Sequence, residues 1–200
     1  MALVAFDLDG TLAVSKSAVT DEMATALVEL LDRVGVCVIS GGARNQLESQ
    51  VVDRLHATDT QLAALHLMPT SGTGYFRFDP IQGSWTAKYE ETLPTETRRR
   101  VIAAITDAAK QLGYWEPKTF GEPIEDRGGQ VTFSALGQEA PPQAKAAWDL
   151  DGAKKRRLRD EVARRLPDLE VRAGGSTSID VTRNGIDKAY GIRRLLTENG

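Results

Sequence analysis

The chain of 200 residues lacks several features that would assign it to a protein class directly. It has a single cysteine, Cys37, which excludes an intramolecular disulfide framework; because Cys37 lies in the apolar run 36–39, we expect it in the core. No apolar run is long enough to span a membrane, and the formal net charge of −3 offers no general attraction for nucleic acid or anionic lipid. Basic residues gather between Lys154 and Arg159, but acidic residues follow directly and no aromatic platform accompanies them. We therefore expect no membrane or nucleic-acid partner.

The most informative stretch runs from residue 3 to residue 11 and reads LVAFDLDGT. Its apolar first part predicts a buried parallel strand over 3–6, and the Gly-Thr pair ends it, so Asp7 and Asp9 lie just past the strand's carboxyl end. That edge is where open α/β sheets bind ligands. Two carboxylates at this spacing on extended backbone point the same way and repel unless a cation or a proton offsets one charge. The alternative is an ordinary turn in which Asp-Gly has no chemical role.

The chemistry that suits this pair of carboxylates is phosphoryl transfer through an aspartyl-phosphate. Asp7 would attack phosphorus, Mg²⁺ held by Asp7 and Asp9 would reduce the repulsion between anionic nucleophile and anionic substrate, and Asp9 would carry a proton to and from the ester oxygen. Gly10 would let the backbone approach the phosphate, and Thr11 would help to orient Asp7 through its hydroxyl and amide. Because the motif begins so close to residue 1, we expect no signal peptide and a cytoplasmic protein.

The next segments predict a βαβ unit of a parallel sheet. Thr20 and the two acids that follow it predict the start of a helix, and an apolar strand comes next over 36–39. That strand ends in Ser40-Gly41-Gly42, directly before another helical pattern in which Leu47, Val51 and Leu55 are expected to face inward. A hydroxyl and backbone amides would then meet at the same sheet edge as Asp7, which suits a bound phosphate. An ordinary strand-to-helix turn explains the local sequence equally well.

From residue 81 the pattern changes, which predicts a second module. The segment contains amphipathic helices around 101–112, 142–148 and 158–166, an alternating strand over 130–136, and strands at 169–172 and 176–181. This order is typical of helices packed on one face of an antiparallel sheet. The predicted fold class is therefore α/β, with a Rossmann-like parallel-sheet core and an inserted α+β cap. We expect the core over 1–80, the cap over 81–183 and a return to the core over 184–200.

The motif at residues 7–11 resembles the nucleophile motif of the haloacid dehalogenase (HAD) superfamily of phosphatases and phosphomutases. Later segments are similar to its branch with a large α/β cap (type IIB) and, within that branch, to phosphomannomutases. The resemblance implies that Asp7 is the nucleophile, that Asp9 is the acid/base, and that Ser40 with Gly41 and Gly42 binds the transferred phosphate. It also implies that Lys188, in the segment NGIDK at 184–188, offsets charge on the nucleophile and the phosphoryl group. Read alone, this lysine is an exposed residue in the first turn of a helix on which Ile192, Leu195 and Leu196 are expected to face inward.

Two cap segments carry the resemblance to phosphomannomutases. Residues 124–134 are similar to a cap strand whose arginine clamps the distal phosphate of the substrate, a role that would fall to Arg127. Residues 174–181 are similar to the neighbouring strand, where Ser178 and Asp180 would hold phosphate and sugar hydroxyls. The alternative is a pair of glycine-flanked strands with polar outward faces.

Several departures from the family pattern bear on substrate and metal binding. Gln138 stands where a second substrate-binding arginine is usual, and Lys16 replaces an arginine with a point charge. The turn at Thr70-Ser71 lacks the acidic residue and asparagine that usually stand there, which puts substrate contact from that turn in doubt. The superfamily's fourth motif, an acidic pair that supplies further Mg²⁺ ligands, has no counterpart in this sequence. We expect either a truncated form of a longer protein, which we favour, or a loss of strong metal binding.

The sequence therefore leads to the hypothesis of a Mg²⁺-dependent enzyme that moves a phosphoryl group on a sugar monophosphate. A hexose-phosphate mutase of the phosphomannomutase kind is slightly favoured by the match in the cap. A sugar-phosphate phosphatase is the alternative, because fewer donors remain for a distal phosphate. A non-catalytic sugar-phosphate-binding protein is the alternative from another class, which the missing acidic motif permits. The resemblance also suggests a homodimer formed through the cap.

Overall fold

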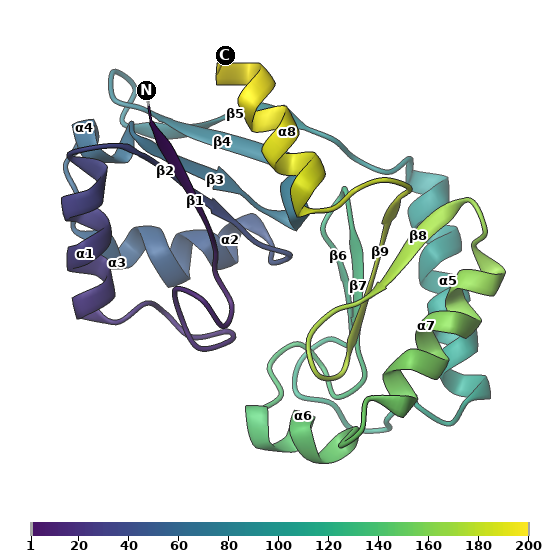
Figure 1. The fold of residues 1–200 in the computed structure, drawn as a ribbon. Helices are drawn as coiled ribbons and strands as arrows, with labels where there is room; N and C mark the ends of the chain where they lie inside the picture. Colours follow the sequence, from purple (N-terminus) through teal and green to yellow (C-terminus); the bar gives the residue numbers. More distant parts are fainter. Residues whose placement is uncertain (1, 200) are drawn as a thin grey trace. The chain divides into compact units, whose positions relative to one another are not determined.

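The structure, a computed structural model, describes residues 2–199 and divides into two compact units (Figure 1). One unit contains the chain up to Glu91 together with the chain from Ile186 onward, and the other contains Thr92–Gly185. The second unit is thus an insertion, which the chain enters once and leaves once. We call the two units the core and the cap and describe each by itself. No helix within residues 2–199 is long and apolar enough to cross a membrane.

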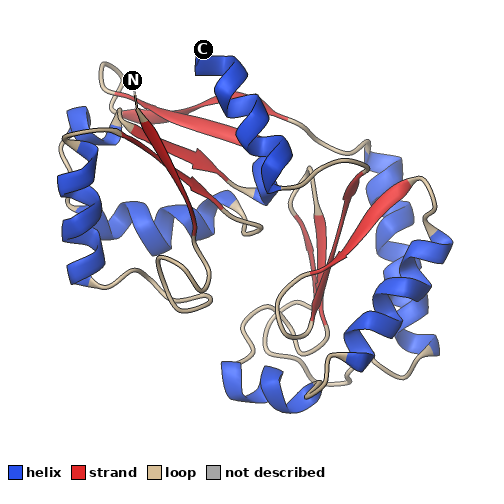
Figure 2. Cartoon of the chain, in the orientation of Figure 1, coloured by secondary structure: helices blue, strands red, loops and turns tan. Residues whose placement is uncertain are grey.

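The core sheet has five strands in the order β1-β2-β3-β4-β5, which are labelled in Figure 1 and drawn in red in Figure 2. They are β1 (Leu3–Asp7), β2 (Gly35–Ile39), β3 (Leu65–Met68), β4 (Gly74–Asp79) and β5 (Ser84–Glu90). The first three strands are parallel, as the βαβ pattern predicted for β1 and β2, and β4 and β5 continue the sheet as an antiparallel hairpin.

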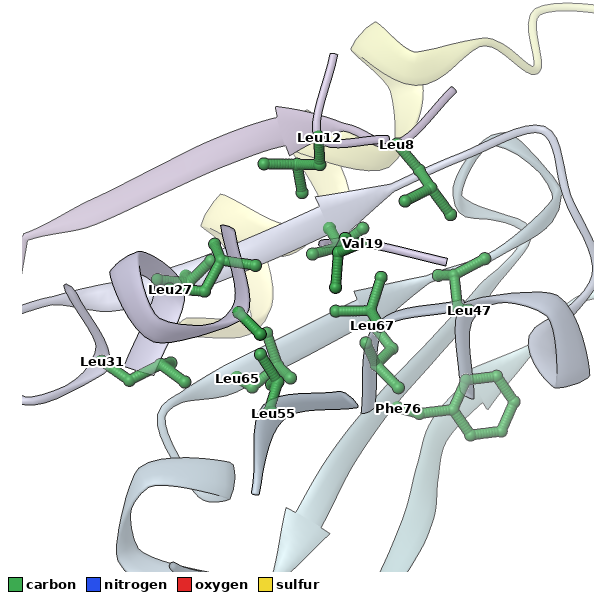
Figure 3. Close-up of a cluster of buried hydrophobic side chains, with 14 residues drawn as sticks. Leu8, Leu12, Val19, Leu27, Leu31, Leu47, Leu55, Leu65, Leu67 and Phe76 are labelled. Atoms are coloured by element: carbon green, nitrogen blue, oxygen red, sulfur yellow. The ribbon is translucent and has the colours of Figure 1, made fainter. Parts of the chain in front are cut away.

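Helices cover both faces of this sheet. They are α1 (Asp21–Leu31), α2 (Arg44–Leu47), the π-helical turn η1 (Glu48–Val52), α3 (Asp53–Leu55), α4 (Asp59–Leu62), the 3-10 turn η2 (Thr70–Gly72) and α8 (Lys188–Asn199). On one face, leucines of α1, α2 and α3 pack toward Leu65 and Leu67 of β3 (Figure 3). On the other face, Leu195 of α8 packs with Cys37 and Ile39 of β2. Successive residues of β2 therefore point into two different apolar layers, as expected of a strand buried on both sides.

Three details differ from the expectation from the sequence. Strand β1 is less buried than predicted, and Val4 is 37% exposed, because β1 is the outermost strand of the described sheet and has a neighbour on one side only. Residues 81–91 lie in the core and not in the cap, because β5 pairs with β4 along its whole length. Leu196 of α8, expected to face inward, is 60% exposed.

The cap contains a four-stranded antiparallel sheet in the order β6-β7-β9-β8. Its elements are α5 (Thr95–Gln111), β6 (Ile124–Asp126), β7 (Val131–Ser134), α6 (Pro142–Trp148), α7 (Ala153–Arg165), β8 (Leu169–Ala173) and β9 (Ser178–Arg183). Ile105 of α5 and Val162 of α7 join one apolar cluster with Phe133 and Val181 of the sheet. Both long helices thus pack on the same face, and the predicted fold class, an α/β core with an inserted α+β cap, is confirmed.

The opposite face of the cap sheet carries polar side chains. Strand register aligns Glu125, Thr132, Asp180 and Arg172 in one row across β6, β7, β9 and β8. Side chains alternate between the two faces of a strand, so apolar residues next to this row, among them Phe133, Val171 and Ile179, belong to the apolar cluster instead. The cap therefore presents a polar sheet face away from its two long helices.

Candidate active site

Three parallel strands of the core end at one edge of the sheet. Asp7 is the last residue of β1 and is aligned with Ile39 of β2, so Ser40 follows directly on the adjacent strand. Ile39 is in turn aligned with Met68 of β3, and the turn η2 follows that strand. The residues singled out at the first two strand ends are therefore neighbours, at the edge where parallel sheets bind ligands.

The carboxylate of Asp7 is held through both of its oxygens. The N–H of Leu8 donates to Oδ1 at 2.8 Å, and Lys188 Nζ lies 2.5 Å from Oδ2. Lys188 is the first residue of α8, whose start is fixed by Asp187, because Asp187 Oδ1 accepts the N–H of Tyr190 at 2.6 Å. The side chains of Asp7 and Lys188 are 37% and 43% exposed, so the pair is fixed in direction yet still reaches solvent. An ammonium at this position can offset charge on a nucleophilic carboxylate and on a phosphoryl group that meets it.

The loop after β1 fixes the second carboxylate. Asp9 Oδ1 accepts the main-chain N–H of Lys16 at 2.7 Å, and Lys16 has a φ of 59°, in the left-handed region. Lys16, predicted as a substrate contact through its side chain, thus holds Asp9 through its backbone. The amide of Thr11, predicted to orient Asp7, donates to the carbonyl of Leu8 at 3.2 Å, and the N–H of Leu8 orients Asp7 instead.

The Ser40-Gly41-Gly42 loop offers a hydroxyl at the same edge. The N–H of Gly42 donates to Ser40 Oγ at 3.0 Å, which leaves the hydroxyl proton of Ser40 as a donor. No atom lies within 4 Å of where a Cβ on Gly41 would stand, so a ligand can approach this part of the backbone closely. The amide of Ala43, at the start of α2, is occupied by Gln46 Oε1 at 3.0 Å. The loop therefore places open space beside Gly41 at this edge rather than a complete helix N-terminus, and the Ser40 side chain itself is almost fully buried.

The turn η2 supports this loop from the neighbouring strand. The N–H of Thr70 donates to the carbonyl of Gly42 at 2.9 Å, and the N–H of Ser71 donates to the carbonyl of Ser40 at 2.8 Å. Thr70 and Ser71 have φ angles of 48° and 58°, a conformation that is costly for residues with a side chain and that concentrates at functional sites. The role of this turn went unrecognised in the sequence, because it is performed by backbone groups and no residue type marks it.

In the cap, the predicted phosphate-clamping arginine forms an ion pair. Arg127 Nη2 lies 2.6 Å from Glu125 Oε2, and the Arg127 side chain is only 7% exposed. Gln138 lies past the end of β7, where its main-chain N–H donates to the carbonyl of Glu122 at 3.1 Å and its carbonyl accepts from Lys145 Nζ at 3.4 Å. Of these two predicted contacts, Arg127 is at the end of the polar sheet face and Gln138 is in the turn beyond it.

Ser178 and Asp180 converge on one spot of the polar sheet face. A Cβ built on Gly174 would stand 2.7 Å from Ser178 Oγ and 2.9 Å from Asp180 Oδ2, so both oxygens point toward this glycine. Asp180 Oδ1 accepts hydrogen bonds from Thr132 Oγ1 at 2.7 Å and Gln130 Nε2 at 3.0 Å. Burial raises the pKa of Asp180, and the hydrogen bonds from Thr132 and Gln130 and the charge of Arg127 oppose that rise.

Few metal-binding side chains gather at the core edge. Within residues 2–199, no group of three or more His, Cys, Asp or Glu side chains is placed to hold an ion. The donors predicted from the sequence for Mg²⁺ are oxygens of Asp7 and Asp9. Both are hard oxygen ligands, which suit Mg²⁺ chemically, and this ion usually completes its shell with water and substrate phosphate.

Comparison with known proteins supports the same class as the motifs. No family model matches the chain. A probable phosphomannomutase from Caenorhabditis elegans is 26% identical over 98% of this chain and 77% of its own length. Phosphomannomutase 1 from Dictyostelium discoideum is 24% identical over 95% of this chain and 75% of its own length.

Solved structures share the fold at lower sequence identity. A haloacid dehalogenase-like hydrolase from Bacteroides thetaiotaomicron superposes with a TM-score of 0.66 at 17% identity, over 99% of this chain and 77% of that one. The C-terminal domain of a trehalose-6-phosphate phosphatase from C. albicans gives a TM-score of 0.62 at 18% identity, over 96% and 60%. The chain thus shares the fold of HAD-like hydrolases, and its sequence is phosphomannomutase-like, which confirms the resemblance predicted from the motifs.

Proposed function

We propose that this chain moves a phosphoryl group on a sugar monophosphate through a phosphorylated Asp7. The observation that carries the proposal is the pair formed by Asp7 and Lys188, 2.5 Å apart, with the N–H of Leu8 on the other carboxylate oxygen. This arrangement points a nucleophile outward from the sheet edge and keeps a positive charge beside the site where anionic oxygens would gather.

Two steps account for the transfer. First, a carboxylate oxygen of Asp7 bonds to phosphorus while the bond between phosphorus and the ester oxygen breaks, and protonated Asp9 gives its proton to the departing oxygen. Second, a hydroxyl group gives its proton to Asp9 and attacks phosphorus, which releases the Asp7 carboxylate. During both steps Lys188 and Ser40 would hold the phosphoryl oxygens. Gly41, Gly42 and Thr11, which belong to the loops after β2 and β1, would be further contacts of the phosphate.

Mg²⁺ is the cofactor that we propose, with Asp7 and Asp9 as its protein ligands. When bound, it would supply positive charge between the nucleophile and the anionic phosphate. Removal of divalent ions by a chelator should abolish turnover, and added Mg²⁺ should restore it; turnover that survives chelation and dialysis would contradict this assignment.

The acceptor hydroxyl in the second step decides between a mutase and a phosphatase. We favour a mutase of the phosphomannomutase kind, in which the acceptor is a sugar hydroxyl and Arg127, Ser178 and Asp180 bind the sugar and its distal phosphate, with Lys16 and Gln138 as further contacts. The specific observation that favours a phosphatase, with water as acceptor, is the ion pair of Arg127 with Glu125, because that guanidinium already has a carboxylate partner. A cytoplasmic location and a homodimer through the cap remain predictions.

One assay separates these readings. The protein is incubated with Mg²⁺ and mannose 1-phosphate, with and without a hexose bisphosphate, and both inorganic phosphate and isomerised sugar phosphate are measured. Isomerisation without net phosphate release supports the mutase, whereas phosphate release alone supports the phosphatase. Asp7→Asn is the matched variant, and we expect it to abolish either activity. If the parent shows neither reaction across a panel of sugar phosphates, or if Asp7→Asn is as active as the parent, the chain is not the enzyme proposed.

A further inference from the structure

A cluster of ionic and aromatic side chains ties the end of β5 to α8 within the core. Glu91 Oε1 accepts a hydrogen bond from the Tyr190 hydroxyl at 2.5 Å and lies 2.6 Å from Arg194 Nη1. Arg194 Nη1 also lies 3.2 Å from the Tyr190 hydroxyl, so the three side chains contact one another in a closed triangle. We call Glu91, Tyr190 and Arg194 the Glu91 clamp.

The clamp is anchored to the sheet beneath it. The Arg194 guanidinium lies over the ring of Tyr89, 4.2 Å from its centroid, and the Tyr89 hydroxyl donates to the carbonyl of Gly72 at 3.0 Å. The main-chain N–H of Glu91 donates to the carbonyl of Thr73 at 2.8 Å. The Glu91 side chain is 19% exposed, and a charged pair that is largely withdrawn from water restrains its partners more than a surface pair does.

The clamp lies where the core chain is interrupted by the cap. Glu91 is the last residue of the core before the chain passes into the cap, and the chain returns to the core at Ile186. The residue held by Glu91 is Tyr190, whose N–H is the one that caps the start of α8 on Asp187. Lys188 lies in this same first turn of α8, and its ammonium lies 2.5 Å from Asp7.

We propose that Glu91 is a positioning residue, which sets the first turn of α8 so that Lys188 stays on the Asp7 carboxylate. The inference rests on the proposed function, because it gives Lys188 a role in phosphoryl transfer. When Glu91→Gln removes the negative charge, the shared acceptor of Tyr190 and Arg194 becomes a neutral amide oxygen, whose hydrogen bonds are weaker, and the link between the N-terminal turn of α8 and β5 is loosened. A small displacement of a catalytic group is enough to slow a reaction by about tenfold or more.

A double-mutant cycle separates positioning from general damage. We compare Glu91→Gln in the parent with Glu91→Gln in a Lys188→Met background, using aryl phosphate turnover with Mg²⁺. We expect kcat to fall about tenfold in the parent with KM nearly unchanged, and to fall by no more than about twofold when Lys188 is absent. Equal losses in the two backgrounds, or no loss in the parent, would overturn the proposal. Glu198→Gln is the matched control, because Glu198 contacts the same arginine at 3.5 Å but makes no contact with Glu91 among the described interactions.

Hydrogen exchange provides a second measurement that needs no activity. We expect the amides of residues 188–195 to exchange faster in Glu91→Gln than in the parent and in Glu198→Gln, while the cap peptides stay unchanged. Tyr190→Phe, which removes only the hydroxyl, should reproduce the effect. Unchanged exchange in both clamp variants would refute the positioning role. If the parent has no phosphotransfer activity, the proposed function fails, and the exchange result still decides whether the clamp holds α8.

Discussion

The helix α8 approaches the turn η2 closely at Gly72 and Gly191, and the loss of this contact should be measurable. A Cβ added to Gly72 would stand 2.4 Å from the Cα of Gly191, and Gly72 has a φ of 89°. Gly72→Ala therefore carries two costs, about 1–2 kcal/mol for the left-handed backbone and about 1–3 kcal/mol for pushing a backbone away. Gly83→Ala is the matched control, because Gly83 also has a positive φ, of 61°, but nothing lies within 4 Å of its Cβ position. We expect Gly72→Ala to destabilise the core by about 2 kcal/mol more than Gly83→Ala.

Cys37 provides a reporter for the core alone. It is the only cysteine of the chain, it lies on β2 with no exposed surface, and burial raises the pKa of its thiol to about 12. Thiol labelling therefore requires opening of the core, and under conditions of rapid reclosing the labelling rate reports the free energy of that opening. A difference of about 2 kcal/mol corresponds to labelling about thirtyfold faster in Gly72→Ala than in Gly83→Ala. Equal labelling rates in the two variants would show that α8 and η2 do not approach each other as closely as described.

Two further predictions concern a buried histidine and the polar face of the cap. Burial, and secondarily the charge of Arg77, lowers the pKa of His66 from 6.5 to about 4. Between these two pH values His66 is therefore protonated in the unfolded chain and neutral in the folded core. Stability should fall by up to about 3 kcal/mol as pH drops from 6.5 toward 4, and His66→Gln should remove this part of the pH dependence in urea titrations; an unchanged slope would contradict it. Gly174→Ala should raise KM for sugar phosphates about tenfold without changing aryl phosphate kcat, because its Cβ would displace Ser178 Oγ and Asp180 Oδ2. Gly175→Ala, whose Cβ would make only an ordinary 3.5 Å contact, is the control, and equal KM values would refute the proposed role of this spot.

The fold was predictable wherever local pattern and burial agree. Leu47, Val51 and Leu55 were predicted to face inward at helical spacing, and all three are buried, even though a π-helical turn interrupts the helix. The expected cap boundary at residue 81 placed residues 84–90 in the wrong unit, since they form the strand β5, which pairs with β4 in a hairpin of the core sheet. Local periodicity predicts that a strand exists, and long-range packing decides where it pairs.

The candidate site was predictable where a side chain carries the chemistry. Asp7 and Asp9 were singled out by residue type and spacing, whereas Ser40 and Lys188 were singled out through the family resemblance, and the Asp7–Lys188 contact joins residues at opposite ends of the sequence. Roles performed by backbone groups cannot be read from residue types. An example is the main-chain N–H of Lys16, which donates a hydrogen bond to Asp9. The Glu91 clamp could not be predicted from the sequence either. Glu91 is separated from Tyr190 and Arg194 by about a hundred residues, and the cap lies between them in sequence.

The central claim is that Asp7 itself becomes phosphorylated. The most direct test is to mix the protein with Mg²⁺ and a phosphate ester, quench the reaction in acid within one turnover, reduce acyl phosphates with borohydride and locate the product by peptide mass spectrometry. The account predicts reduction of residue 7 to homoserine in the parent and no modified peptide in Asp7→Asn. Turnover with no modified peptide, or with the modification on another carboxylate, would contradict it.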